Sequence, residues 1–302
     1  PRSIAKASAE LGFRTVILGC VNNFTESVNI MRENYKYLNN YSPLVSYRLG
    51  FHAEYTTDEK ILIELAKLAN ELHEPVYTHS SETKDEVEGC KKRHNNLTPT
   101  EYFEKLGLYN YGGGAYHCVE MSSHDIEIFK KHNLYAVTCP GSNTKLASGI
   151  ADIEKLYKNG VNLAIGTDGP ASNNALDMFR EMYLVTGLQK LKHQDASAMD
   201  ALEVLYMATV GGARAMGLFD ADVLDINKKA DLIMIDLHQP NMQPINNIAK
   251  NIVYSGSKSN VKMTMINGKI LYEDGKFYFA EPIEEIYQKC NEITESIKKM
   301  MK

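Results

Sequence analysis

Apolar, β-branched runs alternate with longer amphipathic stretches along the first 168 positions of the chain. The amphipathic stretches, such as 57–73, carry apolar residues at three- and four-residue spacing and predict helices that cover a sheet. This alternation is typical of βα units and predicts a parallel sheet. Six runs have the length and composition of strands, at 14–21, 45–52, 75–79, 114–118, 134–139 and 162–168.

The pattern changes near residue 230, after predicted helices at 175–191 and 198–216. Short apolar runs at 231–236, 261–266 and 269–272 are joined by Gly-containing turns, which predicts a small antiparallel module. A last helix, 283–300, carries one apolar stripe; packing explains it most simply, and a contact between two copies is the alternative. We therefore expect a parallel-sheet unit over 1–222 and a β-rich unit with the final helix over 223–302.

Side chains with catalytic chemistry gather where the predicted strands end. His52, His79, His117 and Asp168 close four of the strands, and Glu82 lies three residues beyond His79. Because parallel strands present their carboxyl ends at one edge of a sheet, these side chains are predicted to converge. Imidazoles and carboxylates are the ligands with which zinc or iron is held to activate water.

Each of these residues also has a structural reading. A lone histidine in a strand, such as His79, is more often a core residue than a ligand. Asp168 stands in Thr-Asp-Gly, where it can also serve a turn or a helix cap. For His52 a substrate contact and a structural hydrogen bond are equally open. The joint pattern of His79, Glu82, His117 and Asp168 favours a metal-dependent hydrolase.

Composition narrows the partners and the compartment. With 302 residues, 44% of them hydrophobic, the chain can bury a core, and its net charge of −5 comes without a basic stripe for nucleic acid. We therefore expect a small-molecule substrate and no membrane segment, because no apolar stretch nears the roughly 20 residues that span a bilayer. Five cysteines without a C-x-x-C pair favour the reducing cytoplasm. Because the chain opens on Pro1 inside a predicted helix at 3–11, its native beginning is expected upstream.

Several other motifs do not support a site. Gly112-Gly113-Gly114 lacks the G-x-G-x-x-G spacing and precedes a strand, so we predict a turn. Ser142 and Ser172 have no G-x-S-x-G elbow around them, which argues against a serine nucleophile. The H-x-E and P-C-x-x-C pattern of cytidine-type deaminases is absent as well.

The motifs around these residues resemble those of the 5-methylthioadenosine/S-adenosylhomocysteine deaminases of the amidohydrolase superfamily. The resemblance covers nearly the whole chain, and guanine deaminases and triazine hydrolases share the same motifs. It is carried by Phe51-His52-Ala53, His79-Ser80-Ser81-Glu82-Thr83, Tyr116-His117-Cys118-Val119, Pro140-Gly141-Ser142-Asn143, Lys145-Leu146-Ala147-Ser148-Gly149, Gly166-Thr167-Asp168-Gly169-Pro170-Ala171-Ser172-Asn173-Asn174, Ala208-Thr209, Gly212-Ala213-Arg214-Ala215, Ala230-Asp231-Leu232 and Ile266-Asn267-Gly268.

The resemblance implies an α/β fold, a TIM-like (β/α)8 barrel with a small β-sandwich, and one divalent metal, zinc or alternatively iron. In such proteins an H-x-H pair on strand 1, a histidine on strand 5 and an aspartate on strand 8 hold the metal. Counting back from Asp168, the six predicted strands match strands 3 to 8. His79 and Asp168 then match the metal ligands, and the first two strands with the H-x-H pair are expected to be missing here.

The resemblance also implies roles. His117 would orient the hydrolytic water, Glu82 would pass a proton to the purine, Asp168 would accept the water's proton, and His52 would contact ribose or base. The implied reaction is hydrolytic deamination of an adenosine-type purine with release of ammonia. Two alternatives stay open, another ring substrate such as guanine or a triazine, and a scaffold that binds no metal. The chain departs from many members at Thr138-Cys139-Pro140, where they have His-Asn-Pro, and at Gly19, where we align an Arg.

Overall fold

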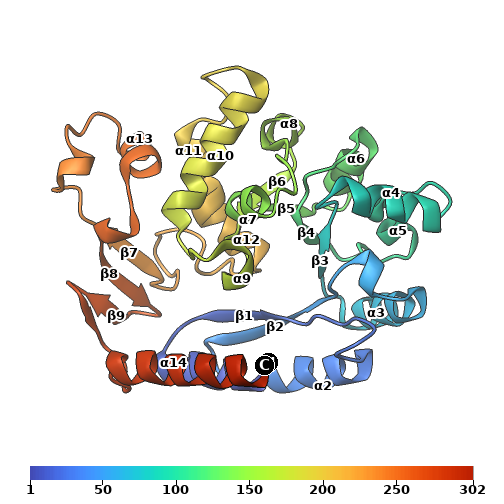
Figure 1. Cartoon of the computed structure of the whole chain (residues 1–302), viewed down its shortest axis with the longest axis horizontal. Helices are drawn as coiled ribbons and strands as arrows, with labels where there is room; N and C mark the ends of the chain where they lie inside the picture. Colours follow the sequence, from blue (N-terminus) through green and yellow to red (C-terminus); the bar gives the residue numbers. More distant parts are fainter. Residues whose placement is uncertain (302) are drawn as a thin grey trace.

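Six parallel strands in chain order form the main sheet of the computed structural model, which describes residues 1–301 (Figure 1). Each strand pairs with the next in sequence, so the neighbour order is β1-β2-β3-β4-β5-β6. The predicted parallel sheet is confirmed. The strands are β1 (Thr15–Leu18), β2 (Val45–Gly50), β3 (Val76–Ser80), β4 (Gly113–His117), β5 (Tyr135–Thr138) and β6 (Asn162–Ile165).

The sheet is open at both ends. Among residues 1–301, β1 pairs only with β2 and β6 only with β5, so the strands curve into part of a barrel without closing it. This confirms the prediction of an incomplete barrel. The open edges leave backbone donors and acceptors of β1 and β6 without a strand partner.

The start of β4 differs from the sequence-based prediction. Gly113 was predicted to lie in a turn, but it pairs with Val76 of β3, while Gly114 pairs with Tyr77 as the first residue of the predicted strand 114–118. A Cβ atom on Gly113 would lie 1.9 Å from the Val76 carbonyl oxygen, and its φ is +128°, so only glycine fits this close approach. The strand therefore begins one residue earlier than predicted, which an alternation pattern cannot show because glycine has no side chain.

Helices connect the strands and cover the outer face of the sheet (Figure 1). The predicted helix 198–216 is interrupted by a π-helical turn, Met207–Gly211, where a Cβ on Gly211 would come within 2.3 Å of the Leu163 carbonyl oxygen. The helices are α1 (Arg2–Leu11), α2 (Val28–Leu38), α3 (Glu59–Leu72), α4 (Lys84–Arg93), α5 (Pro99–Lys105), α6 (Ser123–Lys131), α7 (Pro140–Lys145), α8 (Ile153–Lys158), α9 (Pro170–Asn173), α10 (Met178–His193), α11 (Ala201–Tyr206), α12 (Gly212–Ala215), α13 (Ile248–Lys250) and α14 (Ile283–Met300).

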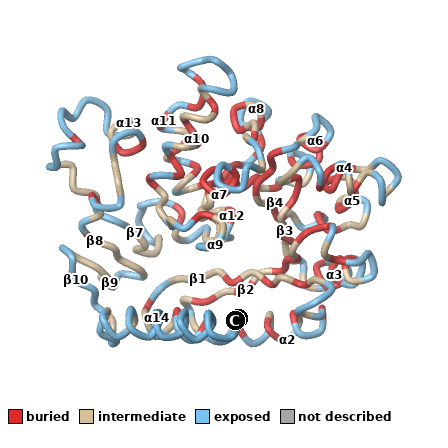
Figure 2. The backbone as a smooth tube through the Cα atoms, in the orientation of Figure 1, coloured by how far each residue is buried: buried red, intermediate tan, exposed pale blue. Residues whose placement is uncertain are grey.

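The main core lies between the sheet and these helices. Tyr47, Leu49 and Phe51 follow one face of β2 and its continuation, and all three are buried. Phe51 meets Phe103 of α5 edge-on, with ring centroids 4.9 Å apart. Figure 2 shows buried residues along β3 and β4 and around α7.

A second sheet of four antiparallel strands follows, as the sequence predicts. Its order is β10-β9-β8-β7, with β7 (Leu232–Ile235), β8 (Val261–Ile266), β9 (Lys269–Glu273) and the two-residue β10 (Lys276–Phe277). The Arg14 guanidinium, just before β1, hydrogen-bonds both carboxylate oxygens of Asp231 next to β7 and so ties the two sheets together. The boundary at residue 222 stays a prediction.

All five cysteines are free thiols. Among the described residues, none of the helices combines the length and the apolar character that crossing a membrane needs.

Candidate active site

His79 is the fourth residue of β3, next to the carboxyl end of the strand. Its Nδ1 atom donates a hydrogen bond to the carbonyl oxygen of His52, at 2.9 Å. With Nδ1 carrying the proton, Nε2 is left as a lone-pair donor, which is the form that binds metals. Burial lowers the pKa of His79, so the ring is neutral under ordinary conditions.

His117 ends the neighbouring strand β4 and lies beside His79. The two ring centroids are 5.5 Å apart and nearly parallel, and His117 adopts a left-handed backbone with φ +73°. Its Nδ1 atom lies 2.7 Å from the Oδ1 atom of Asn143, which acts as acceptor. Its Nε2 atom is therefore free of that bond and lies 3.8 Å from an oxygen of Glu82.

Glu82 lies in the turn between β3 and α4. One of its carboxylate oxygens accepts a hydrogen bond from the Ser148 hydroxyl at 2.9 Å, and the other faces His117. The buried carboxylate of Glu86 accepts the backbone amides of Ser81 and Glu82, at 2.9 and 2.8 Å, which fixes the turn. Helix α4 is capped by Thr83, so Glu82 precedes the cap and is free to face the site.

Asp168 follows β6 and has a left-handed backbone with φ +59°. Its carboxylate accepts the Ser142 hydroxyl and the Gly169 amide, both at 2.6 Å. Burial alone would raise the pKa of Asp168, but these hydrogen bonds more than offset it and the pKa is lowered. The carboxylate is therefore ionised at neutral pH and can act as ligand or base.

His52 lies behind His79, with ring centroids 5.1 Å apart. Its Nδ1 atom is 2.8 Å from the Thr56 hydroxyl, which itself donates to the Ala53 carbonyl oxygen. The Thr56 oxygen therefore accepts from His52, and the structural hydrogen bond considered for this residue is present. The substrate contact implied for His52 stays a prediction.

One short segment supplies the partners of three of these side chains. We call residues 140–149, helix α7 and the turn after it, the α7 segment. Within it, Ser142 donates to Asp168, Asn143 accepts from His117 and Ser148 donates to Glu82. Sequence analysis considered Ser142 only as a nucleophile and gave the other two no role. All three lie in motifs that carry the family resemblance, but the side chains that they contact depend on how the loops meet in space.

A buried carboxylate accepts a hydrogen bond from the backbone of the α7 segment. Glu181 of α10 is fully buried, accepts the Gly141 amide at 2.7 Å and accepts the Asn173 side-chain amide at 2.8 Å. Asn173 also donates to the carbonyl oxygen of Thr167, directly before Asp168. Glu181 thus links the loops after β5 and β6, and sequence reasoning did not single it out.

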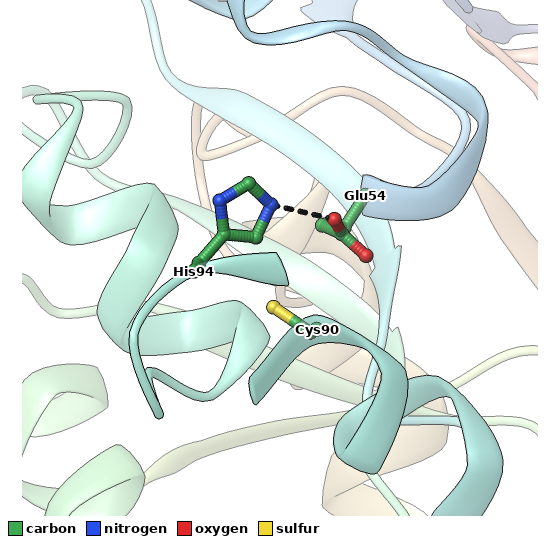
Figure 3. A group of neighbouring side chains, drawn as sticks. All are labelled: Glu54, Cys90 and His94. Carbon is green, nitrogen blue, oxygen red and sulfur yellow. Dashed lines mark hydrogen bonds and ion pairs between the residues drawn. The ribbon is translucent and has the colours of Figure 1, made fainter. Parts of the chain in front are cut away.

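The candidate metal ligands do not form a compact group by themselves. Within residues 1–301, one set of three potential ligands lies within 4.8 Å of one another, and it consists of Glu54, Cys90 and His94 (Figure 3). The Glu54 carboxylate already accepts hydrogen bonds from Arg93 and from His94, so a guanidinium occupies the place a cation would take. We interpret this set as a structural ion-pair cluster.

The donor chemistry around His79 nevertheless fits a divalent metal. His79 and His117 each have Nδ1 engaged by an acceptor and Nε2 left available, and Asp168 is an ionised carboxylate. Nitrogen and oxygen donors of this kind suit zinc. The hydrogen bonds to Nδ1 are the outer contacts that orient metal-binding histidines.

Gly19 has no room for a side chain in this conformation. A Cβ atom there would lie 2.3 Å from the Tyr47 hydroxyl and 2.5 Å from the end of Met31. A side chain at this position would require the ends of Tyr47 and Met31 to shift. At the other departure, Cys139 is buried at the start of α7, and burial raises the pKa of its thiol.

Fold and site together define a (β/α)-barrel scaffold with its polar residues at the carboxyl ends of the strands, where such barrels carry active sites. The chain belongs to the amidohydrolase family, whose model matches residues 2–271. This family membership confirms the resemblance derived from the motifs.

Curated relatives refine the comparison. A 5-methylthioadenosine/S-adenosylhomocysteine deaminase of Thermoanaerobacter pseudethanolicus is 38% identical over 280 residues, which are 90% of this chain and 64% of the relative. A 5'-deoxyadenosine deaminase of Methanopyrus kandleri is 36% identical over 98% of this chain and 69% of its own length. The chain thus spans about two thirds of the length of the relatives it matches.

Solved structures agree with the fold. A zinc-bound adenosine deaminase from Xanthomonas campestris superposes with a TM-score of 0.91 at 29% identity, over 98% of this chain and 69% of that one. A zinc-bound atrazine chlorohydrolase from Arthrobacter aurescens gives a TM-score of 0.85 at 20% identity, over 95% of this chain and 67% of that one. At that identity the second likeness concerns the fold alone.

Proposed function

We propose that His79, Glu82, His117 and Asp168 form the metal-binding and acid–base part of an active site for hydrolytic deamination of adenosine-type purine nucleosides. The observation that carries this proposal is their arrangement at one sheet edge, with the carboxylate of Glu82 facing His117 Nε2. The proposal is also supported by relatives named as 5-methylthioadenosine/S-adenosylhomocysteine deaminases, to which this chain is 36–40% identical.

His79 Nε2 and the Asp168 carboxylate are the atoms we propose to hold a divalent metal, with zinc favoured because a zinc-bound neighbour shares the fold. When bound, such a metal makes water acidic enough to be a nucleophile near neutral pH. The sequence contains no H-x-H pair, so these two residues, with His117 beside them, are the ligands that this chain offers. Iron is the alternative, because histidine and carboxylate ligands also bind it.

The residues of the chain would divide the proton transfers between them. Ionised Asp168 accepts a proton as water adds to the ring carbon that bears the amino group, and His117 Nε2 orients that water. Glu82 delivers a proton to the neighbouring ring nitrogen. Asp168 then returns its proton to the amino nitrogen, which leaves as ammonia when its carbon–nitrogen bond breaks. The added hydroxyl gives its proton back to Glu82 as it becomes the ring carbonyl. His52 is proposed to contact the ribose or base.

Ammonia release in the presence of excess zinc tests the proposal. The panel contains 5-methylthioadenosine, S-adenosylhomocysteine, 5'-deoxyadenosine, adenosine, guanine and a triazine. We expect the adenosine-type nucleosides to be deaminated, and no turnover of guanine or triazine. A preference for guanine or a triazine, or the absence of all turnover while the nucleosides bind, would contradict the proposal.

A further inference from the structure

Tyr55 is an exposed aromatic residue within a stretch of chain that is otherwise held inside the protein. It is the middle residue of the short 3₁₀ helix η1 (Glu54–Thr56), and 55% of its surface is exposed. The nearby residues Ala53, Glu54 and Thr57 are all buried. The backbone of this turn is therefore fixed by its surroundings, while the ring of its middle residue stays accessible.

Both neighbours of this ring are tied to other parts of the fold. The carboxylate of Glu54 accepts hydrogen bonds from Arg93 and His94, at and just beyond the end of α4 (Figure 3). On the other side, the hydroxyl of Thr56 lies 2.8 Å from Nδ1 of His52. A side chain carried by a turn that is already ordered loses little further freedom when it contacts a ligand.

Tyr55 continues a row of rings that begins at the candidate metal site. The ring centroids of His117 and His79 are 5.5 Å apart, and those of His79 and His52 are 5.1 Å apart. The ring of Tyr55 follows edge-on to His52, at 6.1 Å. A nucleoside that lies along this row with its reacting carbon beside His117 has its opposite end, the 5' position of the ribose, at Tyr55.

Two carboxylates also place Tyr55 beside the site. Burial raises the pKa of the Tyr55 hydroxyl, and the negative charges of Glu86 and Glu82 raise it further. Glu86 fixes the turn between β3 and α4 that carries Glu82. Because charges act on a neighbouring group only at short range in water, the phenol lies near this turn, on the side of the proposed proton donor.

An aromatic ring in this position suits an apolar group with a polarisable atom. Sulfur and methyl groups make favourable contacts with aromatic rings, whereas a hydroxyl keeps its hydrogen bonds better in water. The 5' position of 5-methylthioadenosine carries a sulfur and a methyl group, and that of adenosine carries a hydroxyl. The two nucleosides are otherwise alike, so the ring can distinguish them only through this substituent.

We propose that Tyr55 is a specificity-determining residue whose ring contacts the 5' substituent of the nucleoside and favours methylthio over hydroxyl. This inference rests on the proposed deaminase function and assigns the part of the site that distinguishes one adenosine-type nucleoside from another. The ion pair of Glu54 with Arg93 then has a consequence for binding, because it holds the turn that carries the ring.

Calorimetric binding of 5-methylthioadenosine and adenosine to the full chain, with zinc in excess, tests the proposal. Tyr55→Ala should raise the dissociation constant of 5-methylthioadenosine about two- to tenfold more than that of adenosine, which is the worth of a sulfur–aromatic contact. Tyr55→Phe keeps the ring and should restore the wild-type ratio of the two constants. Tyr287→Ala on α14 removes a tyrosine of similar exposure, 53%, and should change neither constant.

The ratio of the two constants separates a direct contact from an indirect effect through His52. A structural role would weaken both nucleosides alike, so an unchanged ratio in Tyr55→Ala overturns the proposal. A ratio that Tyr55→Phe fails to restore overturns it as well, because the hydroxyl and not the ring would then make the contact. Both of these outcomes leave the proposed deaminase function standing. A wild-type chain that binds neither nucleoside would instead contradict that function and this inference together.

Discussion

Glu82 has surroundings that allow the catalytic role proposed for it to be separated from a structural one. One oxygen accepts from Ser148 and the other faces His117 at 3.8 Å, while the turn that holds Glu82 is fixed by Glu86. Because the local structure does not depend on the Glu82 carboxylate for its backbone contacts, replacing it removes proton transfer without unfolding the turn.

We therefore expect Glu82→Gln to lower kcat by roughly 10²- to 10⁴-fold, the usual worth of general acid–base catalysis, with little change in nucleoside binding. Steady-state kinetics and equilibrium binding measure the two quantities. Glu88→Gln, on the exposed side of α4, serves as the control with the same chemical change. A kcat near wild type in Glu82→Gln would remove this residue from the mechanism.

For single residues, the sequence predicts the site side chains that end strands. It does not predict the residues that hydrogen-bond to them or to their loops. His79, His117 and Asp168 could be found because a polar residue closing an apolar run is visible in one dimension. Asn143 and Glu181 could not, since their roles depend on which loops meet in space and on a burial that no local pattern encodes.

Among the elements, the turn 54–56 shows how an ion pair joins segments that the sequence separates. Glu54 accepts hydrogen bonds from Arg93 at the end of α4 and from His94 just beyond it. Burial would raise the pKa of Glu54, but the hydrogen bonds from Arg93 and His94 outweigh burial and the pKa lies below its ordinary value of 4.5. The folded state therefore favours the ionised carboxylate.

Stability from Glu54 is accordingly present above pH 4.5 and lost as the pH falls through the lower, folded-state pKa. Glu54→Gln should reduce the free energy of unfolding most near neutral pH, and its difference from wild type should shrink in acid. Urea unfolding at a series of pH values measures this difference. Glu127→Gln on α6 is an exposed control. A difference that grows toward acid would contradict the assignment.

Element boundaries were predicted less well than the elements themselves. β8 and α14 match their predicted bounds, because one is followed by an Asn-Gly turn and the other carries an unbroken apolar stripe. The helix predicted over 198–216 misses the π-helical turn at Met207–Gly211, since that turn follows from a backbone contact with β6.

For the whole molecule, the open sheet determines how well a metal can be held. The chain offers His79 and Asp168, with His117 nearby, and these do not form a group of three close ligands in residues 1–301. Zinc sites in proteins usually have three or four protein ligands. The small number of ligands, and not their chemical type, limits how tightly the site can hold a metal.

We expect this 302-residue chain to retain well below one zinc per molecule after dialysis, and to take up zinc reversibly when it is added in excess. Elemental analysis before and after dialysis measures retention. Asp168→Asn should abolish the residual uptake, whereas Asp195→Asn on the surface should not. Stoichiometric zinc that survives dialysis would show that the ligand set is complete as it stands.

The α7 segment hydrogen-bonds three side chains of the candidate site, so substitutions in it are expected to affect the site jointly. Ser142 and Ser148 hydrogen-bond two different side chains of the candidate site, Asp168 and Glu82, yet both lie on the same short stretch of backbone. Their effects on turnover should therefore show epistasis. In a double-mutant cycle, Ser142→Ala and Ser148→Ala should deviate from additivity by about 0.5–3 kcal/mol, whereas Ser142→Ala with the distant Ser197→Ala should be additive. Sequence changes within residues 140–149 would then be tolerated only when several occur at once, so that these ten residues change as a group or stay as they are.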